Sequence, residues 1–263
     1  MENTDNSYPN VKEAIFLVMM WMFITFILGM VFSTINIYSD SLTDVICFVF
    51  TSLLTLYLIQ KLHKRDVGVI KRFEFKGINY RLLPFVIFGA ISCLLLGVYQ
   101  PSIPILDRFS SELLGDYLMS TPTIFDFLKF VILVPIFEEL FFRGIILGSF
   151  LKKYSPREAI ILSAIIFAIP HGAGLLGVLL GGLFLGWIYF MTNNLLLSIV
   201  AHASVNLLGF AMRLALIDEK IGMSVPKWGM SDNVFINISI LFFLVIVLVI
   251  CVKLICYYSS QKK

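Results

Sequence analysis

Charged residues are scarce in this sequence. Lys, Arg, Asp and Glu together make up 14% of its 263 residues, whereas hydrophobic residues make up 59%. Soluble domains contain about 45–50% apolar residues, and a soluble chain of this length would not need long uninterrupted apolar runs. The composition therefore argues against a soluble protein and for one that lies in a membrane.

The N-terminus lacks the features of a secretory leader. Residues Met1 to Asn10 are polar and include no basic residue. The apolar run that follows is longer than the core of a signal peptide and has no small-residue cleavage site. We therefore interpret that run as a retained first membrane span.

Signals for several common chemistries are also missing. No Ser stands in a Gly-x-Ser-x-Gly motif and no Cys adjoins a His, so the sequence indicates no protein nucleophile. The four cysteines lie in apolar runs without zinc-finger spacing, and we interpret them as small buried side chains: Cys47, Cys93, Cys251 and Cys256.

Long apolar runs dominate the chain instead. A spanning helix needs about 20 mostly apolar residues, and six clear runs meet this need: Val11–Ser33, Thr43–Gln60, Leu82–Tyr99, Phe125–Phe150, Leu195–Leu216 and Val234–Ile255. A seventh run, Ala159–Met191, is interrupted at residues 170–174, which predicts two short helices joined by a tight turn. The fold class predicted is thus an all-α membrane protein, a polytopic bundle of about eight transmembrane helices with a buried polar site.

Basic residues gather on one side of this predicted bundle. The loops on the other side hold only Arg108, Lys220 and Lys227. The positive-inside rule then places both termini in the cytoplasm, in agreement with an even number of spans. Topology and anionic lipid headgroups explain the basic loops, so we expect the lipid bilayer as a partner and no nucleic acid. The basic residues after the second and fourth spans are Lys61, Lys64, Arg65, Lys71, Arg72, Lys76, Arg81, Lys152, Lys153 and Arg157.

The chain shows no internal repeat and no linker, so we predict a single integral membrane domain over residues 1–263. Residues 1–124 contain almost nothing ionisable within their spans and are interpreted as scaffold helices. Residues 125–216 form the predicted catalytic core, and residues 217–263 an outer loop and the last span. In the core, Gly177 with Gly181 and Gly182 with Gly186 are small-xxx-small pairs, which allow close packing of membrane helices.

Ionisable and polar residues cluster within the apolar runs of the core. Each charge at membrane depth costs on the order of 2.5–3.5 kcal/mol, so such residues mark functional sites. Counting at 1.5 Å per residue puts the relevant side chains of three helices in one layer near the membrane centre. They are Glu138, Glu139 and Arg143 of one span, His171 after Pro170, and His202 with Asn206 of a later span.

The spacing of these residues suggests separate roles. Glu139 and Arg143 are four apart, in the favourable order for a helical ion pair, and either neutralise each other or support the site. Glu138 lies about 100° away around the helix and can face a cavity. His202 and Asn206 share another helix face.

A carboxylate beside an imidazole can hold and deprotonate a water, and a second His and an amide can stabilise an oxyanion. Direct attack by activated water is therefore the mechanism predicted. Two His and one Glu are also a known zinc set, so Glu138, His171 and His202 are the metal ligands if a metal is present. The segment lacks the His-Glu-x-x-His pattern in which two ligands lie one turn apart, and we predict no cofactor, with zinc as the alternative.

At these positions the sequence resembles the CAAX-protease and bacteriocin-processing family of intramembrane glutamic endopeptidases. The family pattern is Glu-Glu-x-x-x-Arg, then Phe-x-x-x-His, then His-x-x-x-Asn or Asp. The resemblance covers about residues 125–210 and shows no departure at the motif positions, which here are Glu138, Glu139, Arg143, Phe167, His171, His202 and Asn206.

The resemblance also implies roles for these residues. Glu138 activates the water, His171 shares it, His202 with Asn206 stabilises the oxyanion, and Glu139 with Arg143 supports the site. It implies a mechanism without obligatory metal. It leaves the substrate open among CAAX-type, bacteriocin and pheromone peptides.

The sequence therefore predicts an intramembrane endopeptidase that acts on a peptide or small protein. The compact chain with short loops favours a bacterial member in the plasma membrane. The alternative is a non-catalytic transporter, bacteriocin-immunity protein or scaffold that uses the same polar cluster for binding, since proton-coupled transporters also bury Glu and His. Neither an internal repeat nor a matched pair of broken helices supports transport.

Overall fold

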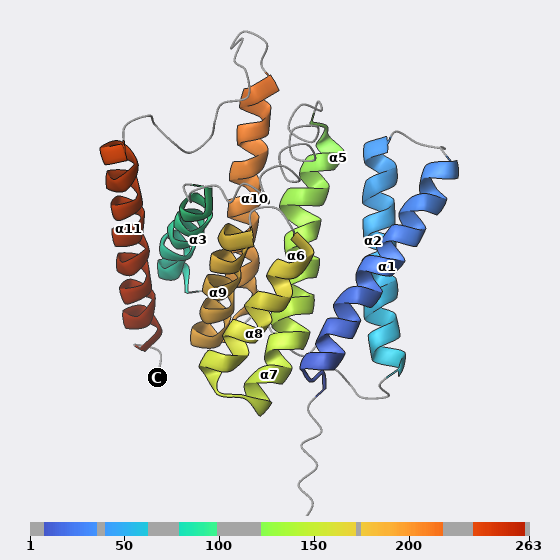
Figure 1. The fold of residues 1–263 in the computed structure, drawn as a ribbon, viewed down its shortest axis with the longest axis horizontal. Coiled ribbons are helices and arrows are strands. Elements are labelled where there is room, and N and C mark those ends of the chain that lie inside the picture. Colours follow the sequence, from blue (N-terminus) through green and yellow to red (C-terminus); the bar gives the residue numbers. More distant parts are fainter. Residues whose placement is uncertain are drawn as a thin grey trace, which may run out of the picture.

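The computed structural model describes residues 8–35, 40–62, 79–98, 122–171, 175–217 and 234–260, and these residues are almost entirely helical (Figure 1). The helices at the two ends of the chain are α1 (Val11–Ile35), α2 (Asp40–Leu62), α3 (Leu83–Val98) and α11 (Val234–Ser260). The predicted all-α class is confirmed for this part of the chain. The predicted basic loop after the second span and most of the loop before residue 122 lie outside the described residues, as do residues 172–174 of the predicted turn.

The predicted fourth span is one continuous helix over residues 124–153. It consists of α5 (Ile124–Phe127), a π-helical segment (Leu128–Leu133), α6 (Val134–Glu139), a second π-helical segment (Leu140–Leu147) and α7 (Gly148–Lys153). A capping box begins it, because the Thr123 side chain accepts from the backbone N–H of Asp126 while the Asp126 carboxylate accepts from the backbone N–H of Thr123. Because it begins the catalytic core predicted from the sequence, we call it the catalytic helix.

The interrupted run forms two short helices, as predicted. The first is α8 (Pro156–Ala168), which Ser155 and Glu158 cap and which ends in a 3-10 turn over Ile169–His171. The second is α9 (Leu175–Thr192), and α10 (Leu195–Ile217) follows it. The break at Pro170 is therefore where the sequence places it, since proline cannot continue the hydrogen-bond ladder of α8.

Within the described residues, four helices are long and apolar enough to cross a membrane: Val11–Phe32, Ser41–Lys61, Leu195–Leu214 and Ile238–Ser260. Large apolar side chains on their outer faces are exposed, among them Phe16, Phe23 and Phe242 at more than 60% each. A surface this apolar needs a lipid environment rather than water, in agreement with a membrane protein.

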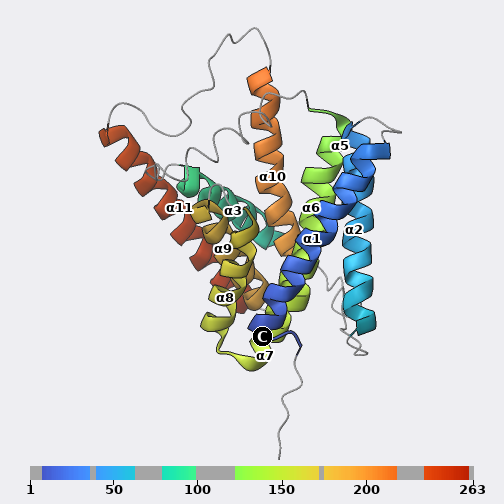
Figure 2. The same ribbon diagram turned by 45° about the vertical axis from the view of Figure 1, so that its right-hand side comes forward.

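The catalytic helix and α10 run side by side through the middle of the bundle (Figures 1 and 2). On one side of them, α3 packs against α9, α10 and α11; on the other, the α1–α2 pair approaches the catalytic helix. One apolar core surrounds Phe142, Ile146 and Phe150 of the catalytic helix, and a second joins α3, α9, α10 and α11. The polar residues of the core helices lie where these layers meet.

Close packing of α8 on α9 depends on one of the two predicted glycine pairs. A Cβ atom at Gly182 would lie 3.3 Å from Cα of Ala164 and 3.2 Å from the Phe167 ring, and one at Gly186 would lie 3.4 Å from Ile160. A Cβ at Gly181 would meet no described atom within 4 Å. The Gly182–Gly186 pair therefore forms the contact, and Gly181 does not contribute to it.

We expect Gly182→Ala to lower the thermal unfolding temperature of the detergent-solubilised protein, because the added methyl group must push the backbone of α8 away. Gly181→Ala is the matched control on the same helix and should leave that temperature unchanged or raise it slightly, since alanine favours helix. Equal unfolding temperatures for the two variants would contradict this account of the α8–α9 contact.

Candidate active site

The catalytic helix carries two adjacent buried carboxylates at the point where α6 passes into the second π-helical segment. Glu138 is 8% exposed and Glu139 is fully buried. Because neighbouring helical residues differ by about 100°, the two side chains face different surroundings. Single π-helical turns inside α-helices occur often at functional sites, and here one such segment lies on each side of α6.

Glu139 binds two partners with a single oxygen. Its Oε1 accepts a hydrogen bond from Nη1 of Arg143 at 2.7 Å, which confirms the predicted pair one turn apart. The same oxygen lies 2.9 Å from Nδ1 of His202 on α10. A carboxylate paired with arginine is an acceptor, so Nδ1 of His202 carries the proton and Nε2 turns the other way.

Arg143 is 1% exposed, and three elements surround its guanidinium. Besides Glu139, its Nη2 donates to the backbone carbonyl of Gly182 on α9 at 3.1 Å. The guanidinium carbon lies 4.5 Å from the centre of the Phe167 ring of α8, in cation–π geometry. This one side chain thus joins the catalytic helix to α8 and α9.

Glu138 faces the second nitrogen of His202. Its Oε2 lies 3.8 Å from Nε2 of His202, which is too long for a direct hydrogen bond. Among the described residues this oxygen has no hydrogen-bond partner. A water can lie within hydrogen-bonding distance of both atoms at once, so the pair can hold a water between a carboxylate and an imidazole.

His171 lies at the end of α8 with an exposed side chain. Its Nδ1 is 2.8 Å from the carbonyl of Phe167, and because a carbonyl only accepts, Nδ1 donates and Nε2 is left as an acceptor. The Phe167 ring contacts His171 at 4.7 Å and His202 at 6.0 Å between ring centres. The two imidazoles therefore contact the same aromatic ring, and among the described residues no hydrogen bond joins them.

Asn206 lies one turn after His202 but binds a different part of the catalytic helix. Its Nδ2 donates to the carbonyl of Phe130 at 2.8 Å. In the first π-helical segment the N–H of Val134 bonds to the carbonyl of Lys129, five residues back. The next donor in that register is Pro135, which has no N–H, so the Asn206 amide donates to the Phe130 carbonyl in its place.

The residues of the zinc alternative do not converge. Among the described residues no group of three His, Cys, Asp or Glu side chains is arranged to hold a metal ion. Glu138 and His202 approach each other, but His171 faces its own helix through Nδ1. The donor set therefore does not fit a zinc site in this conformation.

Three features of the site were not predicted from the sequence: the bond from His202 to Glu139, the Gly182 carbonyl that accepts from Arg143, and the central place of Phe167. The spacing of Phe167 and His171 by four residues was a usable signal for the third. The other two depend on how two helices are rotated relative to each other, which the residue spacing within one helix does not determine.

Known proteins are similar to this chain over the segment that carries the site. The family model for type II CAAX prenyl endopeptidase Rce1-like proteins matches residues 120–208. The UPF0177 protein YxdF of Lactococcus lactis subsp. lactis (strain IL1403) is 31% identical over 146 residues, which are 54% of this chain and 80% of that protein. The chain belongs to the CAAX-protease and bacteriocin-processing family.

The segment matched to the family model contains all of the polar residues described above. It extends from just before the catalytic helix into α10 and leaves out α1, α2, α3 and α11. No solved structure matches this chain. The family-model match therefore covers about a third of the chain, the part that holds the buried polar site.

We expect Glu139→Leu to lower the free energy of unfolding by about 3–5 kcal/mol, because it leaves the buried Arg143 charge without its ion-pair partner. The double variant Glu139→Leu/Arg143→Met removes both charges and should recover most of that loss. The measurement is unfolding of the purified protein in detergent. A double variant no more stable than Glu139→Leu would show that the pair does not act as a unit.

Proposed function

We propose that this chain is an intramembrane endopeptidase in which Glu138 activates a water for attack on a peptide bond. The observation that carries the proposal is the buried Glu138 oxygen, which faces Nε2 of His202 at 3.8 Å and has no hydrogen-bond partner among the described residues. A carboxylate beside an imidazole at this spacing suits general base catalysis. Membership of a family of membrane peptidases supports the same reaction class.

In the proposed reaction, water donates a proton to the Glu138 carboxylate as its oxygen attacks the carbonyl carbon. The carbon–oxygen double bond becomes a single bond, and negative charge develops on the former carbonyl oxygen. The C–N bond then breaks, and the proton held by Glu138 passes to the leaving amine. No covalent enzyme intermediate is required, in keeping with the sequence, which offers no serine or cysteine nucleophile.

The neighbouring residues have distinct parts in this proposal. His202 stabilises the oxyanion in its doubly protonated form, in which Nδ1 donates to Glu139 and Nε2 carries the proton that is donated to the oxyanion. Asn206 stabilises it with the second N–H of its amide, because Nδ2 carries two hydrogens and one is used at Phe130. His171, an acceptor at Nε2, shares the water. Glu139, held by Arg143, keeps His202 oriented with Nε2 towards Glu138.

The proposed substrate is a peptide or small protein that reaches the site in the bilayer. CAAX-type, bacteriocin and pheromone peptides are the substrates that the family suggests. We further propose that the protein crosses a bacterial plasma membrane several times with both termini in the cytoplasm, on the strength of the basic residues gathered on one side of the bundle.

Replacing Glu138 tests the proposal directly. We expect Glu138→Gln and Glu138→Ala to lower kcat for cleavage of a reporter peptide by about 10²–10⁴-fold, the usual contribution of a general base. Glu158→Gln makes the same chemical change on an exposed residue at the start of α8 and should cleave at the wild-type rate. Folded Glu138 variants that cleave as fast as the wild type would overturn the assignment.

The rival function is binding or transport without catalysis. It predicts that purified protein cleaves nothing. It also predicts that a biological activity of the chain survives the loss of Glu138, His171 and His202 together. Family membership does not favour this alternative.

We expect cleavage to persist in the presence of a strong chelator, because Glu138, His171 and His202 do not converge as a ligand set among the described residues. The measurement is the cleavage rate of purified protein before and after chelation, with its zinc content determined in parallel. Activity that disappears on chelation and returns with added zinc would establish a metal mechanism instead.

A further inference from the structure

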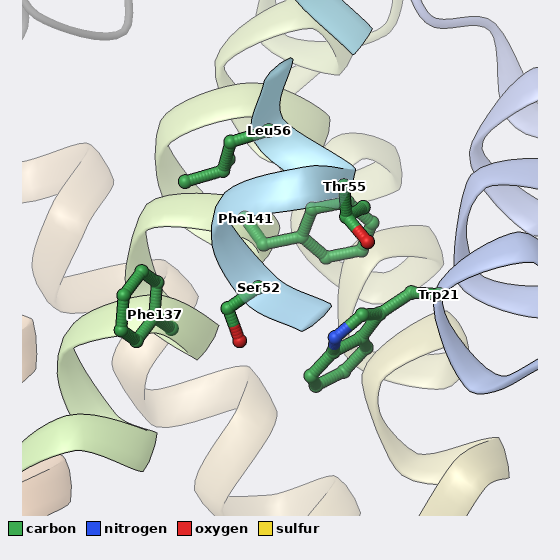
Figure 3. Close-up of a pocket in the computed structure, with 6 residues that line it drawn as sticks. All are labelled: Trp21, Ser52, Thr55, Leu56, Phe137 and Phe141. Carbon is green, nitrogen blue, oxygen red and sulfur yellow. The ribbon is translucent and has the colours of Figure 1, made fainter. Parts of the chain in front are cut away.

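A small polar cavity lies on the side of the catalytic helix away from Arg143, between that helix and the α1–α2 pair. It is lined by Trp21 of α1, by Ser52, Thr55 and Leu56 of α2, and by Phe137 and Phe141 of the catalytic helix (Figure 3). The two hydroxyl groups are buried, with Ser52 4% and Thr55 2% exposed. Neither has a hydrogen-bond partner among the described residues.

Two unpartnered hydroxyls in an apolar layer are costly, because a buried polar group loses its hydration and gains nothing in exchange. Serine and threonine in a helix commonly avoid this cost by donating to a backbone carbonyl of the preceding turn. Thr51 of the same helix does so, donating to the Cys47 carbonyl at 2.7 Å. Ser52 and Thr55 do not, and their oxygens lie on the cavity side of α2 (Figure 3).

The size and lining of the cavity fit one water molecule. Its volume is about 10 Å³, which is close to the least that a single water occupies. Two hydroxyls can each donate and accept, and the Trp21 indole nitrogen, which faces the same space in Figure 3, is a donor. A buried water usually has two to four polar partners, and this cavity offers three.

Aromatic contacts join the two helical layers at the cavity. The ring centres of Trp21 and Phe141 are 5.7 Å apart, and those of Phe48 and Phe137 are also 5.7 Å apart in edge-to-face geometry. Both pairs join the α1–α2 pair to the catalytic helix.

The cavity lies against the helix that carries the proposed general base, and the residues of that helix that line it are Phe137 and Phe141. Phe137 directly precedes Glu138, and Phe141 lies one turn later on the same face of the helix. Glu139 is about 200° around the helix from Phe137 and faces Arg143 and His202. Around the helix, Glu138 lies in angle between Phe137, which lines the cavity, and Glu139, and its Oε2 faces Nε2 of His202.

We propose that this cavity is a water-holding site, in which Ser52, Thr55 and Trp21 retain a water molecule against Phe137, the residue directly before Glu138, and supply it for hydrolysis. Water is scarce at this depth of a membrane, so a peptidase that consumes one water per cleavage benefits from a retained one. The supply role rests on the proposed function, whereas the binding of water does not.

Radiolytic hydroxyl-radical labelling tests the binding, because it oxidises buried side chains that lie next to bound water. In the folded wild-type protein we expect labelling of Phe141, which is 5% exposed, and none of Phe150, which is fully buried elsewhere on the same helix. The variant Ser52→Ala/Thr55→Val should lose the labelling of Phe141. Phe141 as unreactive as Phe150 in the wild type would overturn the site.

Cleavage kinetics test the supply. We expect Ser52→Ala/Thr55→Val to lower kcat about tenfold with KM unchanged, about the effect of losing one hydrogen-bonded water contact. Thr55→Ser keeps the hydroxyl and should retain the wild-type rate. Thr51→Val is the matched control, since it removes a hydroxyl from the same helix that is already bonded to a carbonyl, and it should also cleave normally.

The two proposals fail in different ways. A double variant that cleaves at the wild-type rate overturns the water supply. Loss of activity in Glu138→Gln would still support the proposed peptidase. A wild-type protein that cleaves nothing overturns the peptidase, and the labelling of Phe141 then decides the water site by itself. If the double variant is too unstable to purify, the single variants Ser52→Ala and Thr55→Val carry the same comparisons.

Discussion

The buried charge of Arg143 is the constraint on which the rest of the core depends. A guanidinium that is almost fully enclosed needs partners in several directions, because an uncompensated charge inside a membrane protein is costly. Its partners are the Glu139 carboxylate, the Gly182 carbonyl and the Phe167 ring. They come from the catalytic helix, α9 and α8, so satisfying one charge determines how three helices lie relative to one another.

This arrangement also explains why Gly182 is a glycine. Its carbonyl accepts from Arg143 of the catalytic helix, and a Cβ atom at that position would meet the backbone of Ala164 and the Phe167 ring of α8. The close contact between α8 and α9 and the hydrogen bond to Arg143 therefore both involve Gly182. Phe167 in turn contacts both imidazoles, so the fold and the proposed chemistry share their central side chain.

Much of the bundle was predictable, because apolar runs of sufficient length specify membrane helices without regard to their neighbours. The ion pair of Glu139 and Arg143 was predictable for a related reason, since it depends on spacing within one helix. The bond from His202 to Glu139 was not, because it depends on the rotation of α10 against the catalytic helix. The two π-helical segments add to this difficulty, since they shift the phase of every later side chain relative to an ideal α-helix. The hydroxyls of Ser52 and Thr55 gave no signal at all, as such residues are ordinary in membrane helices that satisfy them internally.

The contact between Asn206 and Phe130 makes two distant positions interdependent. Pro135 takes away the donor that the first π-helical segment would have supplied, and the side chain of α10 replaces it. An ordinary residue at position 135 would bring a backbone N–H to the same carbonyl, where it would compete with the Asn206 amide. The hydrogen bond from Asn206 thus ties α10 to the backbone of the catalytic helix about two turns before the two glutamates.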